Sequence, residues 1–121
     1  MRHFTIIFVA LFLAACATSN PQQKSGLELL PPISQIPAST AEEGSLANSI
    51  LIRDTVAGLE EVTSWSLKET DFRKFVIQEP IGPPGQKAWR ELWIKYEQNF
   101  RFIITFSEDG LGGADFEIRS M

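Results

Sequence analysis

The spacing of apolar residues changes along the chain, from a helical period in its middle to strict alternation toward the C-terminus. After Ser45, apolar side chains recur every three or four residues and so share one face of a helix: Leu46, Ala47, Ile50, Leu51, Val56 and Leu59. Ser45 or Thr40 would supply the capping hydroxyl, and Glu42 and Glu43 would lie favourably near the positive end of the helix dipole. The pattern predicts an amphipathic helix that begins near Ser45.

Strand patterns follow this helix. Residues 72–79 are rich in aromatic and β-branched side chains and end at Pro80, residues 87–96 and 100–106 alternate between two faces, and residues 115–119 can form a last strand. Residues 81–85, 97–99 and 107–113 have the composition of the connecting turns. We therefore expect an α+β fold, in which one N-terminal helix packs on a small antiparallel sheet, a meander of three or four strands.

The first fifteen residues have the pattern of an export signal. Arg2 precedes an apolar run over residues 4–13, which is shorter than the roughly 20 residues of a membrane-spanning helix and suits a secretory signal. The run ends in Leu13-Ala14-Ala15-Cys16, which resembles the lipobox of bacterial lipoproteins. The resemblance implies cleavage before Cys16, acylation of that cysteine and, from Ala17, sorting to the outer membrane facing the periplasm. The alternative is an ordinary signal peptide in which Cys16 is incidental.

The expected organisation is a signal peptide (1–15), a lipidated cysteine with a flexible tether (16–44) and one domain (45–121). The tether is rich in proline, serine and glutamine, a composition that buries too little apolar surface to fold alone. Five aliphatic residues interrupt it and would either dock onto the domain or bind a partner: Leu27, Leu29, Leu30, Ile33 and Ile36.

Charge and composition narrow the function. The chain has 11 basic and 15 acidic side chains, and removal of residues 1–15 leaves a formal charge of −5. This balance argues against nucleic acid as a partner and against a polybasic grip on lipid. His3 is the only histidine and Cys16 the only cysteine, so the mature chain lacks the residues of Ser-His-Asp, Cys-His and zinc chemistry. We expect no catalytic residues, no cofactor and no metal.

Carboxylates are the remaining source of chemistry. Glu91 could face Asp115 or Glu117 across the sheet as a glycosidase-like pair, although so small a sheet offers no deep cleft. Glu108, Asp109 and Asp115 surround a glycine-rich stretch and could offer oxygens to calcium. Solvated sheet charges and an ordinary turn are the simpler interpretations.

Trp89 and Trp93 are the candidate recognition residues, with Glu91 between them on the same strand face. If Ala88, Leu92 and Ile94 face the helix, the two tryptophans lie on the outer surface, where paired aromatics are typical of partner contacts. The alternative is that this face is turned inward or covered, which makes the tryptophans part of the core.

The last strands are also similar to those of small lipoproteins of Gram-negative bacteria that have no assigned activity. The similar segments are residues 89–93, 106–110 and 112–113. We expect a non-catalytic, membrane-anchored accessory or scaffolding subunit that binds an envelope protein through Trp89, Trp93 and Glu91. The alternative is a small-ligand or enzyme-inhibitor module for a basic envelope enzyme or a glycan, which predicts an acidic concavity near residues 108–117.

Overall fold

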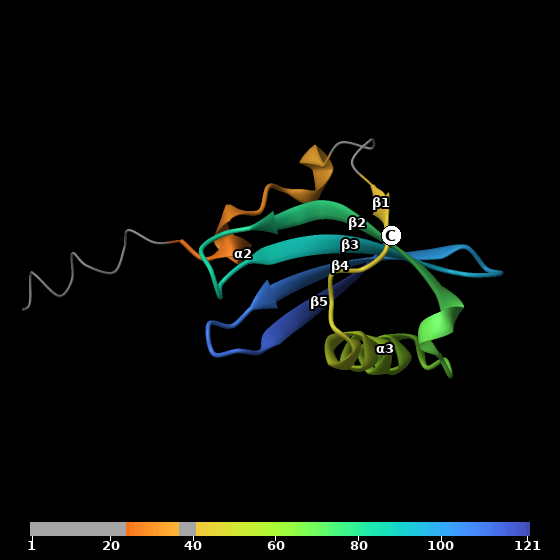
Figure 1. Ribbon diagram of the computed structural model, residues 1–121. Helices are drawn as coiled ribbons and strands as arrows, with labels where there is room; N and C mark the ends of the chain where they lie inside the picture. The colour runs from red at the N-terminus through yellow and green to blue at the C-terminus, as the bar shows by residue number, and fades with distance from the viewer. Residues whose placement is uncertain (1–23, 37–40) are drawn as a thin grey trace, which may run out of the picture.

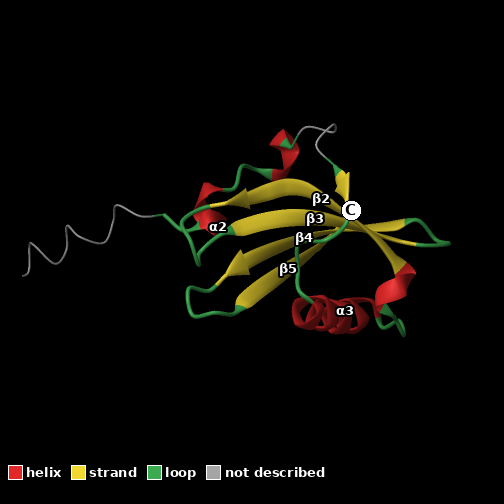
Figure 2. Cartoon of the chain, in the orientation of Figure 1, coloured by secondary structure: helices red, strands yellow, loops and turns green. Residues whose placement is uncertain are grey.

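The computed structural model describes residues 24–36 and 41–121, which form a five-stranded antiparallel sheet with one main helix (Figure 1). The strands lie side by side in chain order: β1 (Glu42–Glu43), β2 (Phe72–Ile81), β3 (Ala88–Lys95), β4 (Phe100–Glu108) and β5 (Ala114–Ser120). Helix α3 (Ser49–Thr63) lies on one side of the sheet, and α2 (Gly26–Leu29) with the 3-10 turn η1 (Ile33–Gln35) lies on the other (Figure 2). The chain therefore has the α+β architecture that the sequence predicts.

The sheet has one strand more than expected. β1 pairs with the middle of β2, with Glu42 opposite Val76 and Glu43 opposite Phe75. The backbone N–H of Gly44 donates to the carbonyl of Lys74 at 2.8 Å, and Glu43 forms an exposed ion pair with Arg73 at 3.5 Å. Residues expected to lie beside a helix dipole or in a flexible tether are thus part of the sheet. Two residues are too few to show a strand period.

The described residues around α2 are docked rather than free, which corrects that part of the expected tether of residues 16–44, while residues 16–23 and 37–40 lie outside the described residues. Ser25 and Glu28 form a capping box that begins α2, and the N–H of Gly26 donates to the carbonyl of Gln86 at 2.7 Å. A Cβ at Gly26 would overlap backbone atoms of Ile81 and Ala88, so only glycine permits this approach. Of the two alternatives for the aliphatic segment, the structure shows docking, although Leu27 and Leu29 stay exposed, at 53% and 40%.

Helix α3 begins four residues later than expected. Asn48 is its N-cap, with the side-chain oxygen accepting from the N–H of Leu51 at 2.8 Å. Thr40 lies outside the described residues, and the Ser45 side chain binds elsewhere. Leu46 and Ile50, expected on the buried face, are 52% and 60% exposed. The helix presents a narrower apolar face than predicted: Leu51, Ile52, Val56 and Leu59.

The core lies between α3 and the sheet face that carries the large aromatic side chains. Trp89 of β3 stacks on Phe106 of β4 with ring centroids 5.2 Å apart, and Trp93 lies 5.6 Å from Phe72 of β2. The remaining buried members come mostly from α3 and β4: Leu51, Ile52, Val56, Leu59, Leu67, Phe102 and Ile104. A Cβ at Gly58 would come within 2.7 Å of the Phe116 ring, so this glycine lets α3 approach β5 closely.

The strands themselves follow the predicted ranges closely. β3 and β4 form the expected hairpin through residues 96–99, in which Glu97 and Asn99 adopt positive φ. β2 continues past Pro80 to Ile81, because register shifts between Val76 and Ile81 break the regular ladder there. A proline is compatible with such an irregular strand end.

Candidate functional site

Trp89, Glu91 and Trp93 face the helix and are buried, with exposed fractions of 7%, 0% and 0%. The prediction that they form an exposed contact face is therefore wrong. Alternation shows that the three share a face, but it does not show which face is covered. Because burial of two indole rings removes far more apolar surface from water than burial of Leu92 and Ile94, the tryptophan face lies against α3.

Glu91 is a buried carboxylate that accepts four hydrogen bonds. One oxygen accepts from the Ser45 hydroxyl at 2.6 Å and the Trp93 indole N–H at 2.9 Å. The other accepts from the Leu46 backbone N–H at 2.8 Å and the Trp89 indole N–H at 2.8 Å. A buried charge is costly unless it is fully hydrogen-bonded, and these four donors meet that requirement.

The Glu91 network fixes the connection between β1 and α3. Ser45 and Leu46 belong to this connection, and the Ser45 oxygen also accepts from the N–H of Ala47 at 3.2 Å. The network also orients Trp89, since its indole N–H is committed to Glu91. The sequence does carry a signal for this network. A tryptophan lies two residues before Glu91 and another two residues after it, so on one strand face two indole N–H donors lie beside one carboxylate.

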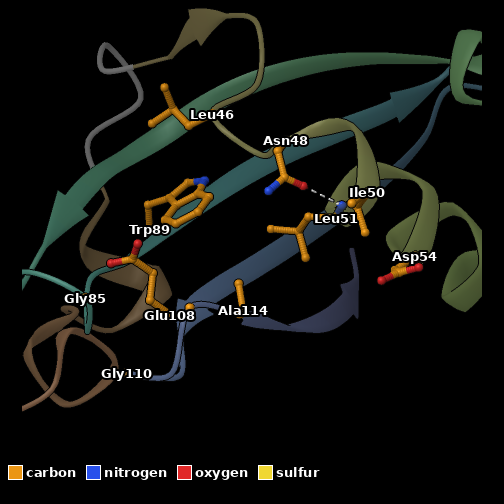
Figure 3. Close-up of a pocket in the computed structure, with 12 residues that line it drawn as sticks. Leu46, Asn48, Ile50, Leu51, Asp54, Gly85, Trp89, Glu108, Gly110 and Ala114 are labelled. Carbon is orange, nitrogen blue, oxygen red and sulfur yellow. Dashed lines mark hydrogen bonds between the residues drawn. The ribbon is translucent and has the colours of Figure 1, made fainter.

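A cleft of about 500 Å³ opens beside Trp89, between the start of α3 and one end of the sheet (Figure 3). α3 and its approach form one wall, and the turns at residues 82–87 and 109–113 border the other. The lining residues are Leu46, Asn48, Ile50, Leu51, Asp54, Gly85, Trp89, Glu108, Gly110, Gly112, Gly113 and Ala114.

The cleft is acidic and partly apolar. Asp54 extends from α3 on one side, whereas Glu108, at the end of β4, lies with Trp89 on the other (Figure 3). One Glu108 oxygen accepts from the backbone N–H of Lys87 at 2.9 Å, which holds the side chain in place. Among the residues that the structure describes, no lysine or arginine side chain lines the cleft. Leu46 and Ile50 add exposed apolar surface at its edge.

An acidic concavity was expected near residues 108–117, but of the acidic residues in this range only Glu108 lines the cleft. Asp115 and Glu117 alternate with Phe116, which packs against the core, so their side chains lie on the opposite face of the sheet. Glu91 faces the core. The structure therefore does not bring Glu91 together with Asp115 or Glu117 as a catalytic pair.

Asp109 organises the turn between β4 and β5. One of its oxygens accepts from the N–H of Leu111 at 2.7 Å and from that of Gly113 at 3.0 Å. Gly110 and Gly112 adopt positive φ, which glycine does without strain. Within residues 24–36 and 41–121, no three histidine, cysteine or acidic side chains are grouped closely enough to hold a metal ion.

A second hollow, of about 480 Å³, lies along α3 near Leu67. Its lining carries both signs of charge: Arg53, Lys68, Glu60 and Glu69. It offers no charge preference of its own, so the cleft beside Trp89 is the stronger candidate.

Two cations lie in surroundings that disfavour their charge. Burial lowers the pKa of Lys74, whose ammonium lies 5.0 Å above the Trp93 ring, although the charges of Glu69 and Glu91 oppose this shift.

Burial also lowers the pKa of Arg90, and the charge of Glu117 opposes that shift. Arg90 donates to the carbonyl of Pro31, and its buried Nε has no hydrogen-bond partner among the described residues. Both side chains help to hold the fold, and neither lines the cleft.

No family model, curated protein or solved structure matches this chain. Cys16 and the rest of the predicted leader lie outside the described residues. Over the part of the chain that the structure describes, no helix is long and apolar enough to cross a membrane.

Proposed function

We propose that this chain is a non-catalytic lipoprotein of the cell envelope, anchored through Cys16, whose domain binds a basic partner in the cleft beside Trp89. The lipobox-like Leu13-Ala14-Ala15-Cys16 supports the anchor, and Ala17 supports the outer membrane. In this proposal the domain faces the periplasm and serves as a small binding module. The absence of histidine after position 3, and of any cysteine besides Cys16, supports a role without catalysis.

The observation that carries the proposal is the placement of Asp54 and Glu108 on opposite sides of a cleft that no lysine or arginine of residues 24–36 or 41–121 lines. Two carboxylates in one concavity attract a cation and give it a preferred position. Trp89, which is largely buried, forms an apolar part of the cleft wall. The exposed Leu46 and Ile50 would cover the aliphatic part of a lysine side chain or an apolar neighbour.

This geometry favours the alternative function over the first expectation. A contact through the sheet face would require exposed tryptophans, and Trp89 and Trp93 are buried. A cleft suits a projecting side chain or a small ligand. The partner is therefore proposed to be a basic segment of an envelope protein, with the domain acting as a binding or inhibitory module.

Binding of a lysine-rich probe tests the proposal. The full-length acylated protein in vesicles would be titrated with a short peptide of alternating lysine and leucine, and with its glutamate counterpart. We expect the lysine peptide to bind and the Asp54→Asn/Glu108→Gln double variant to lose at least tenfold in affinity, because each substitution removes a charge with little change in shape.

The matched control is the Glu61→Gln/Asp115→Asn double variant, which removes the same charge from exposed positions outside the cleft. It should retain the affinity of the unmodified protein to within about twofold. Equal losses in both double variants would show a general charge effect. No binding of the lysine peptide would overturn the proposed cleft function.

A further inference from the structure

Three segments meet at one end of the sheet, and we call them together the anchor end: α2, residues 81–87 and residues 109–113. The N–H of Gly26 donates to the carbonyl of Gln86 at 2.7 Å, and the N–H of Glu108 donates to the carbonyl of Lys87 at 2.8 Å. A Cβ at Gly110 would lie 3.5 Å from the Gln86 side chain. The three segments are therefore in contact and form one surface (Figure 1).

The anchor end exposes several large apolar side chains. Leu111 is 90% exposed at the tip of its turn, and Leu27 is 53% exposed on α2. Leu29 and Ile81 are 40% and 37% exposed. These four side chains gather at one end of the sheet, and grouped exposed apolar residues, unlike single ones, mark interaction sites.

The chain length between this end and the proposed lipid is short. Seven residues separate Cys16 from Lys24, where the described chain begins beside α2. Eight residue steps span at most about 28 Å. The strands are 8–10 residues long, so the opposite end of the sheet lies about 30 Å farther away. Of the two ends of the sheet, the anchor end is the one that the lipid holds close to the bilayer.

We propose that the anchor end docks on the lipid surface, with Leu111 and Leu27 in contact with the headgroup and upper acyl region. This inference rests on the proposed acylation of Cys16. The charges nearby do not favour an anionic surface, since Lys24 and Lys87 lie against Glu28, Glu108, Asp109 and Asp115. Contact is therefore apolar rather than electrostatic, and it does not require anionic lipid.

The opposite end is the competing surface. It exposes Met121 at 70%, Tyr96 at 51% and Phe100 at 46%, although the Phe100 ring packs on Trp65 with centroids 5.0 Å apart. Apolar exposure alone therefore does not separate the two ends, and the short chain to Cys16 is what favours the anchor end. Docking by the anchor end has a consequence for the proposed function. Gly85, Gly110 and Gly112 belong both to the anchor end and to the cleft lining, so the cleft would open beside the membrane.

Depth-dependent quenching of a label at position 111 tests the docking. Because Cys16 is the only native cysteine and is blocked by acylation, Leu111→Cys supplies a single free thiol for a fluorescent label. The acylated protein would be placed in phosphatidylcholine vesicles containing nitroxide lipid. We expect quenching at least threefold stronger than for a label at Gln98→Cys, in the turn at the opposite end, and little change between 50 and 500 mM salt.

Adding Leu27→Glu and Leu29→Glu to the labelled Leu111→Cys protein guards against insertion driven by the label alone. These exposed substitutions should reduce quenching to the level of position 98, because they place charge in the docked surface. Equal quenching at both ends, or quenching that persists with both glutamates, would overturn the docking.

Flotation of the same vesicles separates the possible failures. Protein that floats with the vesicles but is quenched equally at positions 111 and 98 refutes the docking. This result leaves the anchor and cleft proposals standing. Protein that carries no acyl chain and does not float refutes the anchor, and the docking with it. Binding of the lysine peptide in the same samples reports on the cleft independently.

Discussion

Glu91 is the residue on which the arrangement of the domain depends most directly. Its two oxygens join β3 to the approach of α3 and hold both core tryptophans. Removing one partner from a buried charged network leaves donors that water cannot reach.

Substitution of Glu91 by glutamine should strongly destabilise the domain. The amide keeps the shape but replaces one acceptor oxygen by an NH₂ group that faces two donors. We expect the free energy of unfolding to fall by about 3 kcal/mol, measured by urea unfolding monitored by circular dichroism. Sucrose would be added to both proteins if the variant is unfolded without it.

The control is Glu61→Gln, at an exposed position of α3. It should change the free energy of unfolding by no more than about 0.5 kcal/mol. A loss below about 1 kcal/mol for Glu91→Gln would contradict the assigned network.

Lys74 should give a pH-dependent contribution to stability. Burial lowers its pKa in the folded state below 10.5, so above the folded-state pKa the unfolded chain binds more protons. The contribution of Lys74 is therefore least favourable at neutral pH and improves as pH rises through the folded-state pKa toward 10.5. In urea unfolding at pH 7 and pH 9.5, the unmodified protein should gain stability relative to Lys74→Met. A difference that stays constant or moves the other way would show that Lys74 is not desolvated.

At the scale of elements, the N-terminal segment depends on one glycine. Gly26 allows backbone contact between α2 and the turn at residues 82–87. The segment contributes few buried side chains, since Gly26 is the only buried residue of α2. Its position is therefore determined by close backbone approach rather than by apolar burial.

Gly26→Ala should detach this segment while leaving the sheet folded. A methyl group cannot fit beside the carbonyl of Ile81 and the N–H of Ala88. Hydrogen exchange at the amides of residues 26 and 30 should accelerate by at least tenfold, with the amides of β3 and β4 unchanged. Ser34→Ala, an exposed position in η1, should leave the exchange of all these amides as it is. Unchanged protection at residue 26 in the alanine variant would show that the contact is not tight.

The elements differ in how well the sequence predicts them. β3, β4 and the body of α3 carry clear periods of two or of three to four residues, whereas β2 was predicted from its aromatic and β-branched composition. The predicted ranges of α3 and of β2 to β5 lie within a few residues of the observed ones. β1 has two residues, and α2 docks through a glycine, so neither leaves an apolar pattern. The sequence left open which face of β3 is buried, because its alternation fits either orientation and Glu91 argues against burial until its four donors are known.

At the scale of the whole molecule, the cleft depends on contacts between distant segments. Asp54 and Glu108 are 54 residues apart in the chain, and no local pattern relates them. The Glu91 network links these parts, because it positions both the approach of α3 and the Trp89 ring that lines the cleft. The proposed binding site is therefore a product of the tertiary fold.

The indole N–H resonances give the most direct test of binding in the cleft. The chain has three tryptophans, and only Trp89 lines the cleft, whereas Trp65 packs near Phe100 at the other end. The acylated protein in detergent micelles would be titrated with the lysine-leucine peptide and monitored by ¹H–¹⁵N NMR. The proposal predicts that the Trp89 indole resonance shifts, that the Trp65 resonance does not, and that Asp54→Asn/Glu108→Gln abolishes the shift. A shift confined to Trp65, or binding without any change at Trp89, would contradict the cleft as the binding site.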